Sequence, residues 1–264
     1  DVALLTKSFA QTGNEAGLFE KIDTNIVTSI GDLYDIAVNA DGYGPCYSLC
    51  RYGIMYNADA LEKAGLPAPT SYEGLFDDQY AHMVALPDMT STAGPYMLVA
   101  MGGSQEDVTP AMELMQEKKD NIDLWYSTSS DVVNAFTTGE ANIAVFMDIN
   151  MPSLTDSGLN MVWVDAAEGS FSAPATANVV KNCKNPELAQ LFVEYLISKD
   201  TQDKIAEVMN EAPVNKNATM DDSLKTYLAF GDESMNALKE FDEAYITANK
   251  EAWIDTFQRT VAVQ

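Results

Sequence analysis

The sequence predicts an α/β protein with largely parallel sheets, and three observations support this. Short apolar runs rich in β-branched or aromatic residues alternate along the chain with longer segments of helical periodicity. Glycine and proline separate many of these segments. Apolar residues make up 47% of the 264 residues, enough for a sizeable core in one large domain or two modest ones. Alternation of strands and helices is typical of parallel sheets with helices on their faces.

The strands are predicted from short apolar runs that end at turn signals. These runs are residues 2–5, 53–56, 84–86, 142–147 and 161–164. The third run ends at Pro87-Asp88. In α/β sheets, the loops that follow the strands are the usual place for ligands.

The helices are predicted from capping residues and apolar periodicity. The predicted helices cover residues 14–21, 58–64, 109–119, 131–138, 200–209 and 234–261, and a further helix begins at Pro186. Gly65 and Gly139 are expected to end two of them in the left-handed conformation. The clearest start is Asn185-Pro186-Glu187, a cap, a first-turn proline and an acid at the positive end of the dipole. A full apolar stripe follows at helical spacing, made of Leu188, Leu191, Phe192, Tyr195 and Leu196.

Charge and length exclude several classes of function. The chain has 15 Lys+Arg against 40 Asp+Glu, a formal charge of −25, which disfavours binding to nucleic acid or to an anionic membrane surface. No apolar run approaches the ~18–20 residues of a membrane-spanning helix. The cysteines are Cys46, Cys50 and Cys183, an odd number. Cys46 and Cys50 would lie ~13 Å apart in an extended stretch, which is too far for a disulfide bond. The cysteines are therefore expected to be small buried residues.

Catalytic motifs are missing from the sequence. The single histidine, His82, gives little basis for a Ser-His-Asp triad, and no G-x-S-x-G elbow occurs. There is no complete phosphate-binding glycine motif and no Cys/His cluster with zinc spacing. We therefore predict a protein without catalytic residues, without a cofactor and without a metal, that is, not an enzyme.

Several segments, taken in order, carry a resemblance to a known family. They are 41–45 leading into 51–57, then 70–76, 84–94, 138–143, 168–169, 185–189, 195–198 and Gln202. Examples are the G-I-M-Y-N strand at 53–57 and the V-A-L-P-D … S-T-A-G loop at 84–94. The order and spacing together resemble an extracytoplasmic solute-binding protein of an ABC transporter. The most similar group is the type II branch, which is spermidine/putrescine-like and iron-like.

The resemblance implies two α/β lobes, with mostly parallel sheets flanked by helices, joined by hinge strands. Residues 1–52 plus 175–212 would form the first lobe, and 53–174 plus 213–264 the second. The strand-helix-strand unit with which family members begin is missing, so the first lobe would be incomplete. The lobes would close over a solute by a hinge motion. The protein is expected to be periplasmic or extracellular. It would be anchored to the membrane as a lipoprotein if the organism is Gram-positive. The expected partners are a small-molecule solute and the permease subunits, and the protein is expected to be a monomer.

The solute class is predicted by comparison with the family's patterns. The positions that carry Trp and Asp in polyamine binders read Ala173 and Ala175 here, and another Trp position is Met147. No Tyr-Tyr pair of the ferric-ion branch occurs. A small organic anion or zwitterion, such as a carboxylate, amino acid or aminophosphonate, is therefore predicted. The alternatives are a polyamine-binding member of the same family and an enzyme on a related two-lobe scaffold.

Two segments could hold the acid group of such a solute. Ser91-Thr92-Ala93-Gly94 should open a helix, where free N–H groups, hydroxyls and the dipole attract an anion. The alternative for this loop is ordinary N-capping, which needs one hydroxyl. Arg51 lies at a predicted crossing between lobes, where its fork of donors could clamp a carboxylate. The alternative for Arg51 is an ion pair with one of the many carboxylates.

The other candidates follow from positions that contact ligand in relatives. Thr6, Lys7 and Ser8 follow the first strand, and the alternative is a solvated loop.

Asp148 follows a strand end and would contact an amine or hydroxyl of the solute; the alternative is a turn Asp paired with Asn150. Tyr47 and Phe171 are candidate walls of the ligand cleft, and the alternative is that these aromatics belong to the core.

Overall fold

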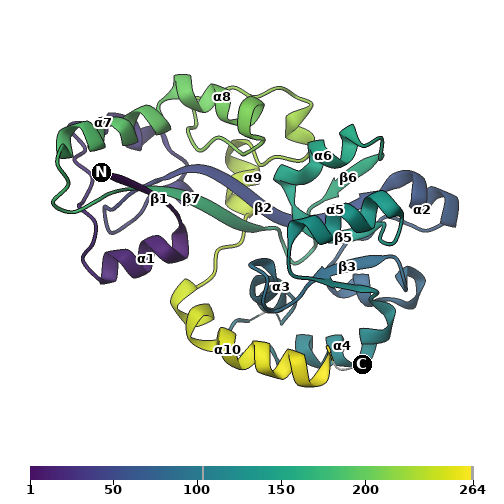
Figure 1. The fold of residues 1–264 in the computed structure, drawn as a ribbon. Helices are drawn as coiled ribbons and strands as arrows, with labels where there is room; N and C mark the ends of the chain where they lie inside the picture. Colours follow the sequence, from purple (N-terminus) through teal and green to yellow (C-terminus); the bar gives the residue numbers. More distant parts are fainter. Residues whose placement is uncertain (103, 263–264) are drawn as a thin grey trace. The chain divides into compact units, whose positions relative to one another are not determined.

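The computed structural model describes residues 1–102 and 104–262, which form two compact units (Figure 1). Unit 1 consists of Asp1–Arg51 and Ser172–Leu238, and unit 2 of Tyr52–Phe171 and Lys239–Gln264. The chain therefore passes from one unit to the other after residues 51, 171 and 238. No helix of the described residues is both long and apolar enough to cross a membrane.

Unit 1 is built on three strands in the order β1, β7, β2. Strand β1 (Val2–Thr6) runs antiparallel to β7 (Phe171–Val179), in a register from Val2 opposite Val179 to Thr6 opposite Ala175. Strand β2 (Cys46–Asn57) follows β7 and continues into unit 2. Because β1 ends this order, one side of it pairs with no other strand of residues 1–102 and 104–262.

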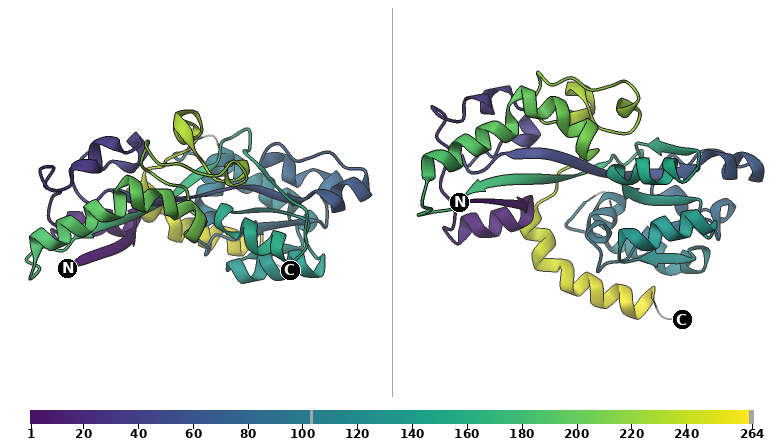
Figure 2. Two further views of the ribbon diagram at one scale, coloured as in Figure 1. Left: turned by 90° about the horizontal axis from the view of Figure 1, so that it is seen from above. Right: turned by 45° about the horizontal axis from the view of Figure 1, so that its top comes forward.

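The helices of unit 1 lie along these strands (Figures 1 and 2). They are α1 (Lys7–Glu15), the 3-10 turns η1 (Thr28–Asp32), η2 (Asp35–Ala37) and η7 (Leu224–Thr226), and α7 (Pro186–Ile197), α8 (Lys199–Met209) and α9 (Gly231–Ala237). Their shared core contains Leu33, Leu49, Val179, Val193 and Val214, each almost fully buried.

The first helix lies earlier than predicted. Residues 14–21 were expected to be helical, but α1 begins at Lys7 and ends at Glu15. Gly17 then adopts a φ of +68°, which few other residues tolerate, and Phe19 forms a bridge to Val180. Tertiary pairing of Phe19 therefore overrides the local helical pattern.

The helix α7 begins at Pro186 as predicted, but most of its apolar stripe does not face the core. Leu188, Leu191, Phe192 and Tyr195 are 63, 47, 42 and 62% exposed. The buried side of α7 consists of Ala189, Gln190, Val193 and Ile197. On this side the Gln190 amide donates to the Lys21 carbonyl at 3.0 Å and accepts from the Asp23 N–H at 3.2 Å. Both sides of α7 are therefore largely apolar, and packing uses the one with the smaller residues.

The boundary between units after residue 238 differs from the predicted boundary after 212. Residues 212–238 stay in unit 1 because side chains of α8 and its neighbours bind their backbone. The Gln202 Oε1 accepts from the Val214 N–H at 2.7 Å, and Leu49 pairs with Ala212 in both directions. The other two boundaries, after 51 and 171, compare with expected positions after 52 and 174.

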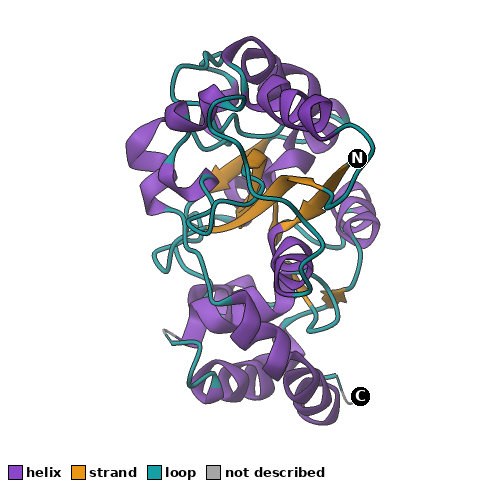
Figure 3. Cartoon of the chain, turned by 90° about the vertical axis from the view of Figure 1, so that its left-hand side faces the viewer, coloured by secondary structure: helices purple, strands orange, loops and turns teal. Residues whose placement is uncertain are grey.

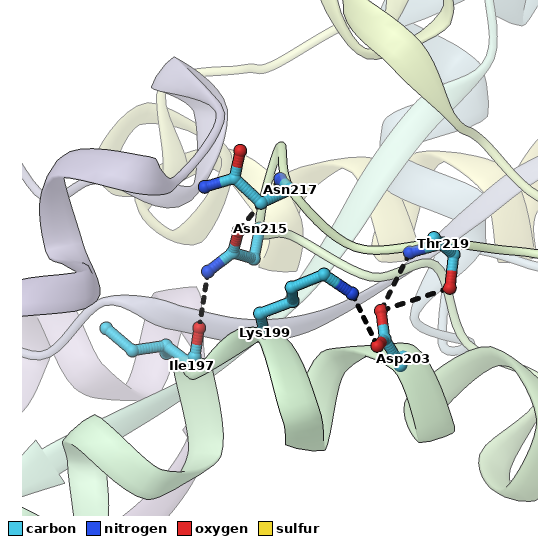
Figure 4. A network of polar contacts seen from close by, with 6 residues as sticks. All are labelled: Ile197, Lys199, Asp203, Asn215, Asn217 and Thr219. Atoms are coloured by element: carbon cyan, nitrogen blue, oxygen red, sulfur yellow. Dashed lines mark hydrogen bonds and ion pairs between the residues drawn. The ribbon is translucent and has the colours of Figure 1, made fainter.

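Figure 4 shows a second set of contacts that fixes this segment to unit 1. Asp203 accepts hydrogen bonds from Lys199 Nζ at 2.6 Å and from the Thr219 N–H at 2.8 Å. The Asn215 Nδ2 donates to the Ile197 carbonyl at 2.9 Å. These bonds join the end of α7 and the start of α8 to residues 215–219.

Unit 2 has a mixed sheet, whereas mostly parallel strands were predicted. The second half of β2 runs antiparallel to β5 (Ile143–Met147) and to β6 (Met161–Val164), while β3 (Val84–Pro87) runs parallel to β5 and to β4 (Leu124–Tyr126). The parallel pairs are the ones joined by helical crossovers, which parallel pairing requires. The mixed composition arises because β2 enters from the other unit and runs against its neighbours.

The helices of unit 2 flank this sheet (purple in Figure 3). They are α2 (Ala58–Ala64), α3 (Ala93–Gly102), α4 (Thr109–Lys118), α5 (Ser129–Thr138), α6 (Met151–Asp156) and α10 (Glu243–Thr260), with the 3-10 turns η3 (Glu73–Phe76), η4 (Asp78–Tyr80), η5 (Lys119–Asn121) and η6 (Asp148–Asn150). Gly65 and Gly139 end α2 and α5 in the left-handed region, as the sequence predicts.

Candidate functional site

The loop between β3 and α3 is built around the carboxylate of Asp88. Its Oδ1 accepts hydrogen bonds from the Thr90 N–H (2.8 Å), the Thr90 hydroxyl (2.7 Å) and the Ser91 N–H (2.9 Å). Its Oδ2 accepts from the Ser127 hydroxyl at 2.6 Å. Because β3 and β4 are parallel, their carboxyl ends meet, and Asp88 joins the two loops that follow them.

Ser91 caps the start of α3. Its Oγ donates to the Asp88 carbonyl at 2.8 Å and accepts from the Gly94 N–H at 3.0 Å. Gly94 is required for this approach, because a Cβ there would lie 2.0 Å from the Asp88 carbonyl oxygen. Ser91 is thereby an N-cap, one of the two roles that the sequence leaves open.

The next residue, Thr92, is exposed, and its hydrogen-bond donors are not used within the loop. Within residues 1–102 and 104–262, neither the Thr92 hydroxyl nor the N–H groups of Thr92 and Ala93 have a hydrogen-bond acceptor. Three donors thus converge at the positive end of the α3 dipole, which is suited to an anionic group. The Ser91 hydroxyl therefore serves in capping, and anion binding at Thr92 and Ala93 stays a prediction.

Arg51, in unit 1, is held by a backbone carbonyl. The side chain is buried, and its Nε and Nη2 donate to the Tyr227 oxygen at 3.2 and 2.8 Å. This contact joins β2 to the segment that follows η7. The Tyr227 carbonyl is neutral, and this contact fixes the orientation of the guanidinium.

The start of α1, also in unit 1, brings Thr6, Lys7 and Ser8 together. Thr6 is exposed at the N-cap position, and its Oγ1 lies 3.3 Å from the Ser8 Oγ. No side-chain cap hydrogen bond forms at this end of the helix. The three residues remain candidate ligand contacts.

Tyr47 and Cys46 occupy the unit 1 part of β2. Tyr47 is half-buried against the core, and burial raises the pKa of its phenol, with Glu211 adding to the effect, so the hydroxyl remains a donor. The Cys46 thiol donates to the Ser48 carbonyl at 2.8 Å, and burial raises its pKa to about 12. Cys46 is therefore a buried packing residue, as the sequence predicts.

Asp148 is fully buried at the start of η6. Its Oδ1 accepts from the Ile149 N–H at 2.9 Å, and the Asn150 amide donates to the Met147 carbonyl at 3.3 Å. Through these bonds Asp148 takes part in the turn that follows β5. Its contact with a solute stays a prediction.

Phe171 lies in the middle of an aromatic cluster in unit 2 with 1% of its surface exposed. It stacks on Tyr52 and Tyr96 at centroid distances of 5.1 and 5.8 Å. The Tyr96 hydroxyl donates to Glu243 Oε2 at 2.6 Å, which ties the cluster to α10. Burial, with a contribution from Glu243, raises the Tyr96 pKa, so this proton stays on the phenol.

Sequence reasoning missed Asp88, which organises the loop it had identified. The available signal was an acidic residue directly after a buried strand, but Pro87-Asp88 is also typical of a plain strand end.

A separate hollow of about 710 Å³ in unit 2 has Ser71, Glu73, Met101, Glu168, Lys239 and Phe241 among its lining residues. None of the predicted ligand residues lines it. The described residues contain no group of three or more Cys, His, Asp or Glu side chains placed to hold a metal ion.

A family model described as bacterial extracellular solute-binding protein matches residues 1–232. The chain belongs to this family. Family members are solute-binding proteins of ABC transporters, which work with small-molecule solutes and membrane permeases on the extracellular or periplasmic side. A comparison with curated proteins finds no match.

Solved structures show the same type II fold. An ABC transporter protein from Clostridium perfringens is 29% identical, with 99% of this chain and 83% of that chain covered and a TM-score of 0.85. An extracellular solute-binding protein from Bordetella parapertussis is 23% identical, with 99 and 82% covered and a TM-score of 0.86. The periplasmic binding protein AfuA from Actinobacillus pleuropneumoniae, with exogenous fructose-6-phosphate bound, is 18% identical, with 100 and 83% covered and a TM-score of 0.75.

Proposed function

We propose that this solute-binding protein captures a small organic anion or zwitterion, such as a carboxylate, an amino acid or an aminophosphonate, and releases it unaltered to a permease. The observation that carries the proposal is the start of α3. There Asp88 and Ser91 fix the loop, while the Thr92 hydroxyl and the Thr92 and Ala93 N–H groups have no internal acceptor among the described residues. Hydrogen bonds to a charged acceptor are stronger than neutral ones, so an acid group gains most from these donors.

Arg51 supports the same solute class from unit 1. Two of its nitrogen atoms donate to the Tyr227 carbonyl, which holds the planar guanidinium in a fixed orientation. A preoriented guanidinium loses less conformational freedom when it binds a carboxylate.

Isothermal titration calorimetry on refolded, ligand-stripped protein tests the proposal, with amino acids, dicarboxylates, aminophosphonates and spermidine as probes. We expect at least one acid to bind and spermidine not to bind. Tight binding of spermidine with none of the acids would overturn the anion proposal. Chemical alteration of a bound probe, detected by mass spectrometry, would overturn the proposal of binding without turnover.

A matched pair of variants locates the acid group. Thr92→Val removes one hydroxyl at nearly constant volume and should weaken acid binding by about 10–150-fold, as expected for one charge-assisted hydrogen bond of ~1.5–3 kcal/mol. Thr137→Val changes an exposed threonine on α5 of the same unit, whose hydroxyl donates to the Val133 carbonyl, and should leave affinity unchanged. Equal affinity of Thr92→Val and the unchanged protein would remove the start of α3 from the site.

A further inference from the structure

The hollow of about 710 Å³ lies within unit 2, away from the start of α3. Its lining includes Val99, Ala100 and Met101, which form the last part of α3. The donors of Thr92 and Ala93 are at the other end of this helix, roughly 10–12 Å away along its axis at the rise of an α-helix. A volume of this size is in the range of small-molecule sites. The hollow is therefore a candidate for a second, separate binding site.

One part of the lining is apolar and includes an aromatic ring. Val99 and Met101 are 3 and 5% exposed, and Phe241 is half-buried just before the start of α10. The Phe241 ring lies against Tyr96 and Phe171 at centroid distances of 5.9 and 6.4 Å. Helices α3 and α10 also pack against each other (Figure 1). Because its neighbours hold the Phe241 ring in place, the hollow offers a fixed surface against which another ring can pack.

Two acidic residues, Glu73 and Glu168, line the hollow beside this apolar part. The Glu168 carboxylate has a fixed orientation, because its Oε1 accepts from the Glu73 N–H at 3.1 Å and its Oε2 from the Tyr72 N–H at 3.0 Å. Each carboxylate oxygen has two acceptor positions, so Glu168 can accept a further hydrogen bond from a ligand. Glu73 is exposed at the first turn of η3. The hollow thus places oriented acceptors next to an aromatic surface.

The electrostatics of the hollow favour a cation. Lys239 contributes a positive charge to the lining, and its aliphatic stem lies over Gly169, where an added Cβ would be 2.8 Å from the Lys239 Cε. Against this charge stand two carboxylates and the negative end of the α3 dipole, since α3 as described has no basic residue in its last turn. The formal charge of −25 on the whole chain also raises the local concentration of cations.

We propose that this hollow binds a small arylalkylamine, that is, an ammonium group joined to an aromatic ring by a short chain. The ammonium donates to the Glu168 carboxylate and lies near Glu73, and the ring packs against Phe241 and Met101. Burial of the ring selects against inorganic cations and against spermidine, whose charges are spread along a chain without a ring. The site is independent of the solute proposed for the start of α3.

The test is an amide-resolved NMR titration of isotope-labelled protein with phenethylamine, phenylpropionate and spermidine. We expect phenethylamine to bind with a Kd on the order of 0.1–1 mM and to move the amide signals of Met101, Glu168 and Lys239. Phenylpropionate has the same ring with an acid in place of the amine, so it should leave these three signals unchanged, as should spermidine. The signals of Thr92 and Ala93 report separately on the start of α3, so binding of an acid there is distinguished from binding in the hollow.

Two pairs of variants locate the ligand. Ala167→Trp places a large side chain in the hollow from an exposed lining position and should weaken phenethylamine binding at least tenfold, whereas Ala237→Trp, at an exposed position of α9 in unit 1, should not change it. Glu73→Gln removes an exposed lining charge and should weaken binding about 2–5-fold, as expected for an exposed ion pair. Glu62→Gln, an exposed position on α2 of the same unit, is its control and should leave binding unchanged.

Four results would overturn the proposal. Phenethylamine at about 10 mM that moves none of the three signals would show that the hollow binds no arylalkylamine. Equal binding of phenethylamine and phenylpropionate in the hollow would show that the ring alone is selected. Shifts with phenethylamine that are confined to Thr92 and Ala93 would place the amine at the start of α3. Unchanged affinity in folded Ala167→Trp would place it outside the hollow.

Discussion

Replacing Gly94 by alanine tests whether the start of α3 depends on a close approach of two backbone segments. An alanine Cβ at this position would lie 2.0 Å from the Asp88 carbonyl oxygen and 3.0 Å from Met89 Cα. Both neighbours are backbone atoms, so the loop must move by more than an ångström to reach ordinary contact. The Asp88 carbonyl would then lose its hydrogen bonds from the Ser91 N–H and the Ser91 hydroxyl, now 3.2 and 2.8 Å.

Three effects set the size of the change in the free energy of unfolding. Overpacking against backbone costs about 1–3 kcal/mol. The two hydrogen bonds contribute about 0.5–1.5 kcal/mol each. The better helix propensity of alanine returns about 0.5–1 kcal/mol. The expected net destabilisation is about 1–5.5 kcal/mol, which lowers the midpoint of thermal unfolding by roughly 2–22 °C.

Differential scanning calorimetry measures this shift, and titration calorimetry measures the affinity of Gly94→Ala for the acid that the unchanged protein binds. We expect at least a tenfold loss of affinity, because the donors of Thr92 and Ala93 move with the loop. Gly31→Ala is the matched control, since no atom lies within 4 Å of its added Cβ and its φ is not positive. It should be neutral or slightly stabilising. A midpoint of Gly94→Ala within 2 °C of the unchanged protein would refute the reasoning.

Three further predictions concern single side chains. Arg51→Ala should weaken acid binding by more than about tenfold, because charge-assisted hydrogen bonds contribute ~1.5–3 kcal/mol, and an unchanged affinity in calorimetry would remove Arg51 from the site. Burial and Glu243 raise the pKa of Tyr96, so its proton favours the folded state; stability should fall as the pH rises above about 10, and Tyr96→Phe should flatten this fall in chemical denaturation. The hydrogen bond from Lys199 lowers the pKa of Asp203 from its ordinary 3.8, so the ionised Asp203 stabilises the fold above this pH, and the stabilisation is lost as the pH falls below it. Asp203→Asn should therefore show a shallower loss of stability on acidification.

The sequence predicts the elements of this fold better than their packing. Helix α7 begins at Pro186, where its proline and periodicity place it, because these signals are local, although the Asn185 side chain makes no capping hydrogen bond. Its apolar stripe nevertheless faces away from the core, because the opposite side offers Ala189, Val193 and Ile197, which pack more closely. Periodicity reports that a face is apolar, and it cannot report which of two apolar faces the protein buries.

The division of the chain into units depends on contacts that no local pattern contains. Residues after 212 were assigned to the second lobe, yet Gln202 and Asp203 on α8 bind the backbone of Val214 and Thr219. A glutamine and an aspartate on an acidic helix give no sign of this in the sequence. In contrast, the boundary predicted after residue 52 lies one residue from the division after Arg51, since the G-I-M-Y-N run at 53–57 that suggests it is contiguous.

The loop from Ser91 to Gly94 shows why the sequence left two roles open. Capping a helix and binding an anion both require hydroxyls and free N–H groups at a helix start, so the same residue types predict either role. In the structure the Ser91 hydroxyl is used within the loop, whereas the Thr92 hydroxyl is exposed and has no partner among the described residues. The Asp88 carboxylate accepts from the donors of Thr90 and Ser91, so if an anion binds at this helix start, we expect it at the donors of Thr92 and Ala93.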